Sequence, residues 1–409
     1  MENQNGIACQ IRQRTLMVTD GAIHYNFDRS GRFLFLTEPG RAVRRGLDHR
    51  MVESLQPPGR PQKRRYRDLT QTEKDAVLAR AYQSVQTCLM QLTAQEAGSF
   101  SKQTSHISTV PEQRDTRLEL DWLQKILAWQ SRGLEMETKA FRRTYLPISI
   151  LPPDQYHSLV VQVTEGCSYN RCLFCDFYRD RPFKIKSDEA LREHLGNIQA
   201  FFGERLSDMD EIFLGDGNAL VVPTQSLLSM LTAIQTQLGK PFSTISTFVD
   251  TFTLDKKTEA DLARLHEAGL NTAYIGFETG LDELRRTLKK PGTAAEAAEA
   301  VRLLKHAGWR VAIILLVSIG ERGLAARHLH ATVEALASIP LEGTDLIYLS
   351  PFVEPNNSPY LAASPQVREQ LVPASSHDVN KEFQLWKQAI LSRHEKVKIS
   401  LYPIRQHLY

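Results

Sequence analysis

Apolar runs of strand length alternate with amphipathic helical stripes through residues 151–351. After each run, apolar side chains recur every three or four positions, which is the period of a helix with one buried face. Strands that alternate with helices pair in parallel through right-handed crossovers, so the pattern predicts an α/β domain shaped as a partial, TIM-like (β/α)6 barrel. The six predicted strands are Leu159–Val163, Glu211–Leu214, Ser243–Val249, Thr272–Phe277, Val311–Val317 and Asp345–Leu349.

Glycines mark the ends of the predicted helices between these strands. Gly239, Gly269 and Gly308 each follow an apolar stripe, at the position where a helix commonly ends in a left-handed residue. Ser187 precedes Asp188 and Glu189 and is expected to cap the helix that follows the first strand. The predicted stripes begin at Leu191, Leu227, Leu262 and Val301.

Residues 1–150 show a different pattern, and we expect a mixed, largely helical region there. Asp28–Gly31 separates two alternating runs and predicts a β-hairpin or small meander. Thr70 and Glu73 form a capping box at the start of a long helix, in which Cys88 is expected to be a core residue. The remaining predictions are a basic linker over 41–67, a loop over 99–113 and a second helix over 117–130.

The C-terminal residues 352–409 are predicted to form a short extension of the barrel. A loop over 351–364 precedes a helix over 380–393 and a last strand over 397–402. The sequence therefore divides into residues 1–150, the barrel at 151–351 and the extension at 352–409.

Composition and charge exclude few classes of protein. The 409 residues carry 50 Lys and Arg against 47 Asp and Glu, a net charge of +3, so overall charge gives no case for nucleic acid. No apolar run approaches the roughly 20 residues that cross a bilayer. Five cysteines, three of them clustered, favour a reducing, cytoplasmic setting over a disulfide framework.

One basic segment stands out locally. Residues 41–67 carry nine basic residues (Arg41, Arg44, Arg45, Arg50, Arg60, Lys63, Arg64, Arg65, Arg67) against Asp48 and Glu53. A solvated linker is the preferred interpretation, and a contact surface for RNA is the alternative.

Three cysteines within nine residues carry the candidate chemistry. Cys167, Cys172 and Cys175 follow the first predicted strand in the spacing C-x4-C-x2-C, and no cysteine lies beyond them. A two-iron cluster of the plant ferredoxin type would need a fourth cysteine. A zinc site would need a histidine such as His157 or His194. The third possibility is a four-iron cluster with one iron open to a ligand.

The segment GCSYNRCLFCDFYRDRPF resembles the cluster loop of the radical S-adenosylmethionine (radical SAM) superfamily, with aromatic Phe174 before the last cysteine. The commonest spacing there is one residue shorter between the first two cysteines. The resemblance implies a [4Fe–4S] cluster on Cys167, Cys172 and Cys175 that binds S-adenosylmethionine.

Two later segments extend the resemblance and imply further cofactor contacts. Gly215, Asp216 and Gly217 are similar to the glycine-rich motif that contacts the methionine amino group, and glycine allows such close approach. The block from Ile275 to Thr293 resembles one in which Glu278 would face the ribose and Lys290 the carboxylate. Thr247 and Ser318 are weaker cofactor-binding candidates, and Tyr178, Arg179, Arg181 and Lys184 are candidates for the rim of the site.

The resemblance implies that a reduced cluster cleaves S-adenosylmethionine to a 5′-deoxyadenosyl radical, which abstracts hydrogen from a substrate at the barrel mouth. A flavodoxin or ferredoxin-type protein would supply the electron. A small molecule is the expected substrate and RNA the alternative, with no role for a membrane. A non-enzymatic iron–sulfur electron-transfer or metal-binding protein on the same fold is the competing hypothesis.

Overall fold

The computed structural model describes residues 7–12, 14–56, 65–100, 116–320, 322–355, 359–372, 378–404 and 407–409. Its chain divides into two compact units. Unit 1 comprises residues 1–144, 201–208 and 408–409, and unit 2 comprises residues 145–200 and 209–407. None of the helices in the described part of the chain is long and apolar enough to cross a membrane.

Unit 1 contains an antiparallel meander of seven strands that pair in chain order. The turn between the third and fourth strands is fixed by Asp28, whose Oδ1 accepts hydrogen bonds from the backbone of Ser30 and Arg32. This confirms the predicted turn at Asp28–Gly31. The strands are β1 (Ile7–Arg12), β2 (Thr15–Asp20), β3 (Ile23–Asp28), β4 (Phe33–Glu38), β5 (Arg41–Arg45), β6 (Met51–Leu55) and β7 (Arg65–Asp68).

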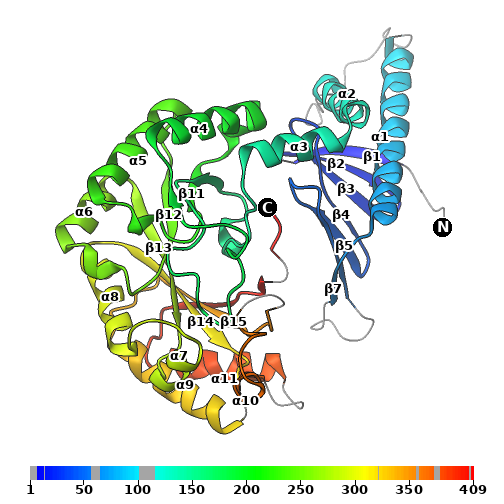
Figure 1. The fold of residues 1–409 in the computed structure, drawn as a ribbon. Helices are drawn as coiled ribbons and strands as arrows, with labels where there is room; N and C mark the ends of the chain where they lie inside the picture. Colours follow the sequence, from blue (N-terminus) through cyan, green and yellow to red (C-terminus); the bar gives the residue numbers. More distant parts are fainter. Residues whose placement is uncertain are drawn as a thin grey trace. The chain divides into compact units, whose positions relative to one another are not determined.

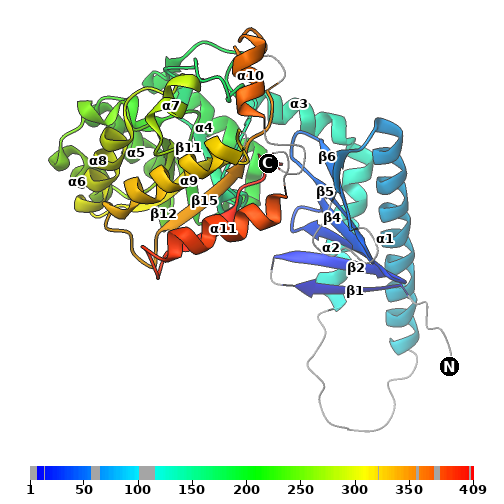
Figure 2. The same cartoon turned by 90° about the horizontal axis from the view of Figure 1, so that it is seen from below.

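Helices α1 (Gln71–Phe100) and α2 (Thr116–Arg132) pack on this sheet, and α3 (Leu134–Thr144) follows them. Figure 2 shows α1 running beside the sheet. The common core includes Phe27 and Val43 from the strands and Tyr82, Cys88 and Trp122 from the helices. The core position of Cys88 is confirmed, as is the capping box, because Thr70 N–H donates to Glu73 Oε2 at 2.8 Å.

The predicted basic linker is wrong, because the described part of residues 41–67 lies largely in three strands of the sheet. Residues 41–45, 51–55 and 65–68 are strands, in which Val43, Met51 and Val52 are buried and Arg41, Arg45 and Arg67 have carboxylate partners. Glu53 lies 2.5 Å from Arg41 Nε and 2.6 Å from Arg67 Nε. Arg60, Lys63, Arg64 and most of the predicted 99–113 loop lie outside the described residues.

Unit 2 contains a parallel sheet of seven strands in the order β16-β15-β14-β13-β12-β11-β8. Figure 1 shows this sheet curving, with α4, α5, α6 and α8 on its outer side. β8 and β16 are the two edges, so within the described residues the barrel is open, as the sequence predicts. The strands are β8 (Leu159–Gln162), β11 (Glu211–Gly215), β12 (Thr244–Val249), β13 (Leu270–Glu278), β14 (Arg310–Val317), β15 (Leu346–Pro351) and β16 (Lys398–Leu401).

The helices of unit 2 begin and end close to the predicted stripes. Gly239, Gly269 and Gly308 have the positive φ angles expected after α5, α6 and α8. The α-helices are α4 (Asp188–Phe202), α5 (Thr224–Leu238), α6 (Glu259–Glu267), α7 (Asp282–Thr287), α8 (Ala294–His306), α9 (Arg322–Ala337), α10 (Pro365–Leu371) and α11 (Val379–Leu391). Short 3-10 turns of unit 2 span Pro153–Gln155, Ala219–Val221 and Leu254–Lys256, and a further one, Gly203–Asp208, belongs to unit 1.

Two features of unit 2 differ from the sequence-based description. The last strand, β16, pairs in parallel with β15, so residues 359–404 continue the barrel unit as far as they are described. A small antiparallel ladder of β9 (Thr164–Glu165) and β10 (Lys184–Ile185) follows β8 and was not predicted. Both strands of this ladder are too short to produce a periodic pattern.

Candidate functional site

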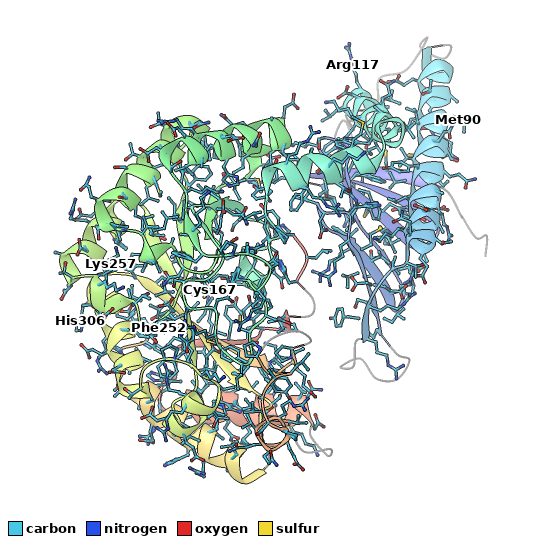
Figure 3. The ribbon with its side chains drawn as sticks, viewed as in Figure 1. Met90, Arg117, Cys167, Phe252, Lys257 and His306 are labelled. Carbon is cyan, nitrogen blue, oxygen red and sulfur yellow. The ribbon has the colours of Figure 1, made fainter. Side chains whose placement is uncertain are left out.

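The three clustered cysteines lie in one loop at the end of β8. Because β9 pairs with β10, the two ends of loop 166–183 are held side by side, and Lys186 Nζ lies 2.6 Å from Glu165 Oε1 across this ladder. Cys167, Cys172 and Cys175 are half-buried and none forms a disulfide. Figure 3 places Cys167 on the inner side of the curved sheet, whereas His306 lies on an outer helix. The loop therefore presents three free thiols at the carboxyl ends of the strands.

Asn170 accommodates the extra residue between the first two cysteines. Its φ of 49° is in the left-handed region, which asparagine adopts more readily than most residues. In this conformation its backbone N–H donates to Cys167 Sγ at 3.3 Å, and its side-chain amide donates to Tyr178 O at 2.8 Å. The longer spacing is thus folded into a local turn.

The far side of the loop is fastened by contacts to backbone carbonyls. Arg179 Nη2 donates to Cys172 O at 3.0 Å and to Cys175 O at 3.2 Å. Leu173 N–H donates to Leu288 O at 2.9 Å, and Tyr169 OH donates to Lys289 O at 2.8 Å. The cysteine loop is therefore connected directly to the segment that follows α7.

The Asp216 carboxylate holds the base of the same loop. Gln162 Nε2 donates to its Oδ1 at 2.7 Å, Gly166 N–H donates to its Oδ2 at 3.0 Å, and Arg181 Nε lies 3.2 Å from Oδ2. Burial raises the pKa of Asp216, and the Arg181 guanidinium works against that rise. The carboxylate is thus committed to the loop and does not line the adjacent cavity.

Gly217 is required by a close approach between the β11 end and the cysteine loop. A Cβ at this position would lie 2.9 Å from Gly166 O and 3.2 Å from Cys167 Cβ. No side chain fits there without moving the loop. The sequence motif predicts a close approach of the backbone to a cofactor. In the structure, the absence of a side chain at Gly217 also leaves room for the cysteine loop.

Glu278 and Lys290 form a buried pair at the end of β13. Lys290 Nζ lies 3.5 Å from Glu278 Oε1, and both side chains are less than one-tenth exposed. Burial raises the pKa of Glu278. Burial works to lower the pKa of Lys290, but the Glu278 carboxylate together with Cys172 and Asp250 outweighs it, so the pKa of Lys290 is raised and the ammonium stays charged. A Cβ on Gly276 would lie 2.8 Å from Glu278 Oε1 and 3.0 Å from Lys290 Nζ.

Arg285 positions this pair through the backbone on both sides of it. Its Nη1 donates to Phe277 O at 2.8 Å and to Thr279 O at 3.2 Å, the carbonyls that flank Glu278. Its Nη2 donates to Pro291 O and its Nε to Gly292 O, both at 2.9 Å, directly after Lys290. The guanidinium is 1% exposed. It therefore fixes the left-handed conformation of Glu278, whose φ is 67°, and the approach of Lys290.

A cavity of about 170 Å³ brings these groups together at the carboxyl ends of the strands. The predicted residues that line it are Cys167, Cys172, Phe174, Cys175, Gly217, Glu278 and Lys290. Much of the remaining wall is aromatic and includes Phe177, Phe248, Phe252, Tyr274 and Phe352. A buried ion pair in such a wall offers a few polar contacts in an otherwise apolar site, which is typical of a ligand cavity.

Other predicted residues lie outside the cavity lining. Thr247 Oγ1 donates to Leu214 O at 3.1 Å, and Ser318 Oγ donates to Glu382 Oε2 at 2.6 Å, so both hydroxyls have protein partners. Gly215 lies within β11. Of the predicted rim residues, Tyr178 lines the cavity, Arg181 binds Asp216 and Lys184 is exposed.

The side chains that could act as metal ligands at this cavity suit an inorganic cluster better than a zinc ion. Burial raises the pKa of Cys172 to about 11 and that of Cys175 to about 12, so a metal must displace the protons. Among the described residues, no group of three or more His, Cys, Asp or Glu side chains could hold a single metal ion. His194 accepts a hydrogen bond from Gln162 N–H at 3.0 Å, and His157 and His194 do not line the cavity. Three thiols around one cavity fit a larger, thiolate-bound group.

Arg285 is the residue that sequence reasoning missed. It occupies the same helical stripe as Leu281 and Leu288, at positions that are otherwise apolar. A basic residue in an apolar stripe is a signal of a buried, fully bonded guanidinium.

Part of this unit is similar to a known protein family. Residues 161–334 match the family model described as the radical SAM superfamily, whose members use a [4Fe–4S] cluster and S-adenosylmethionine. A search of curated proteins found no match.

The solved structures that this chain matches include three enzymes. Methylornithine synthase (PylB) is 13% identical over 66% of this chain and 83% of its own, with a TM-score of 0.40. Coproporphyrinogen III oxidase (HemN) from Escherichia coli, a radical SAM enzyme, is 13% identical over 57% of this chain and 52% of its own, with a TM-score of 0.40. The cobalamin-dependent S-adenosylmethionine radical enzyme OxsB is 17% identical over 58% of this chain, with a TM-score of 0.35. This chain spans 30% of the length of OxsB.

Proposed function

We propose that the chain is a radical SAM enzyme that cleaves S-adenosylmethionine reductively and abstracts hydrogen from a small molecule, since residues 161–334 match the model of that family. One observation carries the proposal. Three free thiols and a buried Glu278–Lys290 pair line the same cavity at the mouth of a parallel barrel. This is the edge of an α/β barrel at which active sites are built.

Cys167, Cys172 and Cys175 would hold the [4Fe–4S] cluster. When bound and reduced, the cluster supplies the electron that converts S-adenosylmethionine to methionine and a 5′-deoxyadenosyl radical, which removes hydrogen from the substrate. The protein keeps the loop in shape through Asn170, Arg179 and the Asp216 carboxylate. Most of these contacts use the backbone of the loop, and all three sulfur atoms remain able to bind iron, because a thiolate that accepts an N–H keeps further lone pairs.

Lys290 and Glu278 would bind the polar ends of S-adenosylmethionine. The Lys290 ammonium is a fixed cation for the methionine carboxylate, and the Glu278 carboxylate is an acceptor for the ribose hydroxyls. Gly217, which lines the cavity, would allow the methionine amino group to approach the backbone, and Phe174 would pack on the cofactor. Asp216, Thr247 and Ser318 already have protein partners, so the proposal gives their side chains no cofactor contact.

The aromatic wall would keep water from the reacting atoms. Phe248, Phe252, Tyr274 and Phe352 present ring surface to the cavity, and a radical formed there meets few competing polar groups. The walls also favour a small substrate with apolar surface over a phosphate backbone. Four of the six described basic residues of the 41–67 segment have carboxylate or histidine partners, which removes the observation that favoured RNA.

We place the enzyme in the cytoplasm, where a reducing environment keeps the cluster thiols free, with a flavodoxin or ferredoxin-type protein as electron donor. The competing hypothesis is an electron-transfer protein that holds a cluster without S-adenosylmethionine chemistry. The Glu278–Lys290 pair favours the enzyme, since a cluster alone needs no second buried polar pair beside it.

Formation of 5′-deoxyadenosine tests the proposal. Protein reconstituted anaerobically with iron and sulfide is incubated with S-adenosylmethionine and dithionite, and the nucleoside products are separated by chromatography. We expect 5′-deoxyadenosine from the native chain and none from Cys172→Ala. A native chain that holds the cluster and yields no 5′-deoxyadenosine would support the electron-transfer hypothesis instead.

A further inference from the structure

Arg179 differs from Arg181, another arginine of the cysteine loop, in how its charge is matched. Arg181 faces two carboxylates, since its Nε lies 3.2 Å from Asp216 Oδ2 and its Nη1 lies 3.0 Å from Asp180 Oδ2. Arg179 forms no ion pair with a carboxylate in the part of the chain that the structure describes. Its charge is therefore not neutralised locally.

The Arg179 guanidinium is held against the backbone that carries two of the thiols. A single nitrogen, Nη2, donates to both Cys172 O and Cys175 O at 3.0 and 3.2 Å. The Nε atom is buried and has no hydrogen-bond partner among the described residues. The half-buried side chain thus keeps a full charge and a spare donor next to the loop.

We propose that Arg179 raises the reduction potential of the cluster bound by this loop, in addition to holding the loop in shape. The proposal rests on the function proposed above, because it requires a cluster on Cys167, Cys172 and Cys175. Reduction adds one electron, supplied here by dithionite, and therefore one negative charge beside the loop. A fixed cation favours that added charge.

The size of the effect follows from the partial burial of Arg179. An opposite charge within a few ångströms shifts the pKa of a neighbouring group by about one to three units. Such a shift changes the protonation equilibrium at least about tenfold. The same tenfold change in the ratio of reduced to oxidised cluster corresponds to about 59 mV for a one-electron couple. An exposed cation has a much smaller effect, because water and salt screen it.

Three variants separate the charge of Arg179 from its shape. Arg179→Lys keeps the charge, Arg179→Gln removes it and keeps a donor, and Arg171→Gln removes the same charge from an exposed residue adjacent to Cys172. Each protein is reconstituted, its iron and sulfide are counted, and the midpoint potential is measured by dithionite titration followed by electron paramagnetic resonance. We expect Arg179→Gln to shift the midpoint to a more negative value, by about a tenfold change in the reduced-to-oxidised ratio. Arg179→Lys and Arg171→Gln should stay close to the native chain.

An unchanged midpoint in fully loaded Arg179→Gln would overturn the proposal and leave Arg179 with a structural role only. An equal shift in Arg171→Gln would overturn it too, since any nearby cation would then suffice. If Arg179→Gln takes up no cluster, neutral Arg179→Met is measured in its place. Failure of both neutral variants to load would refute a separate effect on the potential. Failure of the native chain to assemble a cluster would refute the proposed function itself.

Discussion

Replacement of Arg285 by methionine tests whether the Glu278–Lys290 pair is positioned by the backbone around it. Methionine keeps an unbranched side chain of similar length but removes all donors. Four carbonyls then lose a bond from this buried guanidinium; Phe277 O still accepts from Thr279 N–H, whereas the carbonyls of Thr279, Pro291 and Gly292 lose the donor that Arg285 gave them. A buried acceptor left unsatisfied costs about 1–3 kcal/mol. Because the costs at the three carbonyls are not additive, we expect a loss of about 3–5 kcal/mol in the free energy of unfolding.

Urea unfolding followed by circular dichroism measures this loss, and equilibrium dialysis of the reconstituted protein measures the affinity for S-adenosylmethionine. Arg286→Met is the matched control, because Arg286 is the next residue of the same helix and is exposed. It should change stability by no more than about 0.5 kcal/mol. We expect Arg285→Met to weaken cofactor binding by at least about tenfold, since displacement of the pair costs more than 1.4 kcal/mol. Native stability and native affinity in Arg285→Met would refute the positioning role.

Three further predictions concern the same unit. Lys290→Met should lower the affinity for S-adenosylmethionine by about tenfold or more at unchanged iron content, because a charge-assisted contact to the carboxylate is lost. Gly276→Ala should lower the same affinity, since its methyl group would lie 2.8 Å from Glu278 Oε1, and native affinity would contradict the geometry. Burial lowers the pKa of His328 to about 4, below its usual 6.5, so the neutral ring contributes stability that is present above about pH 6.5 and is lost as pH falls toward 4. The stability difference between the native chain and His328→Asn should therefore shrink by about 2 kcal/mol between about pH 7.5 and pH 5 in urea titrations, and a constant difference would refute it.

The barrel could be predicted because its signals are local and repeated. Each strand is a short apolar run, and Gly239, Gly269 and Gly308 supply the left-handed residues that end three of the helices. All seven strands of the unit 2 sheet fall where the apolar runs predict them, including the last, near residues 398–401. Parallel pairing then follows from the crossovers rather than from any single residue.

The sheet of unit 1 could not be predicted in the same way, because its charges are neutralised by residues from other strands. Arg41 and Arg67 read as a solvated basic linker until Glu53 is placed between them on the strand that joins theirs. The pairing of the strands determines which arginines meet a carboxylate. The separation of these residues in the sequence does not reveal that pairing. The local density of positive charge was therefore a poor guide to a nucleic-acid surface.

The sequence could predict the residues of the candidate site whose chemical type determines their role. It could not predict contacts that depend on the three-dimensional path of the chain. The three cysteines are identified by type and spacing, and Glu278 and Lys290 by the resemblance to a family block; all five line one cavity. Asp216 and Gly217 belong to a recognisable motif, but their contacts go to the cysteine loop. Such a contact depends on the path of the loop in space, which the spacing of residues does not determine.

The most direct test of the account is the electron paramagnetic resonance spectrum of the reduced, reconstituted chain with and without S-adenosylmethionine. The account predicts about four irons per chain on three thiolates, with one iron open, so addition of S-adenosylmethionine should change the spectrum of the reduced cluster. Cys172→Ala should show neither the cluster nor the change. A complete four-iron cluster whose spectrum is identical with and without S-adenosylmethionine would contradict an open iron and with it the central claim.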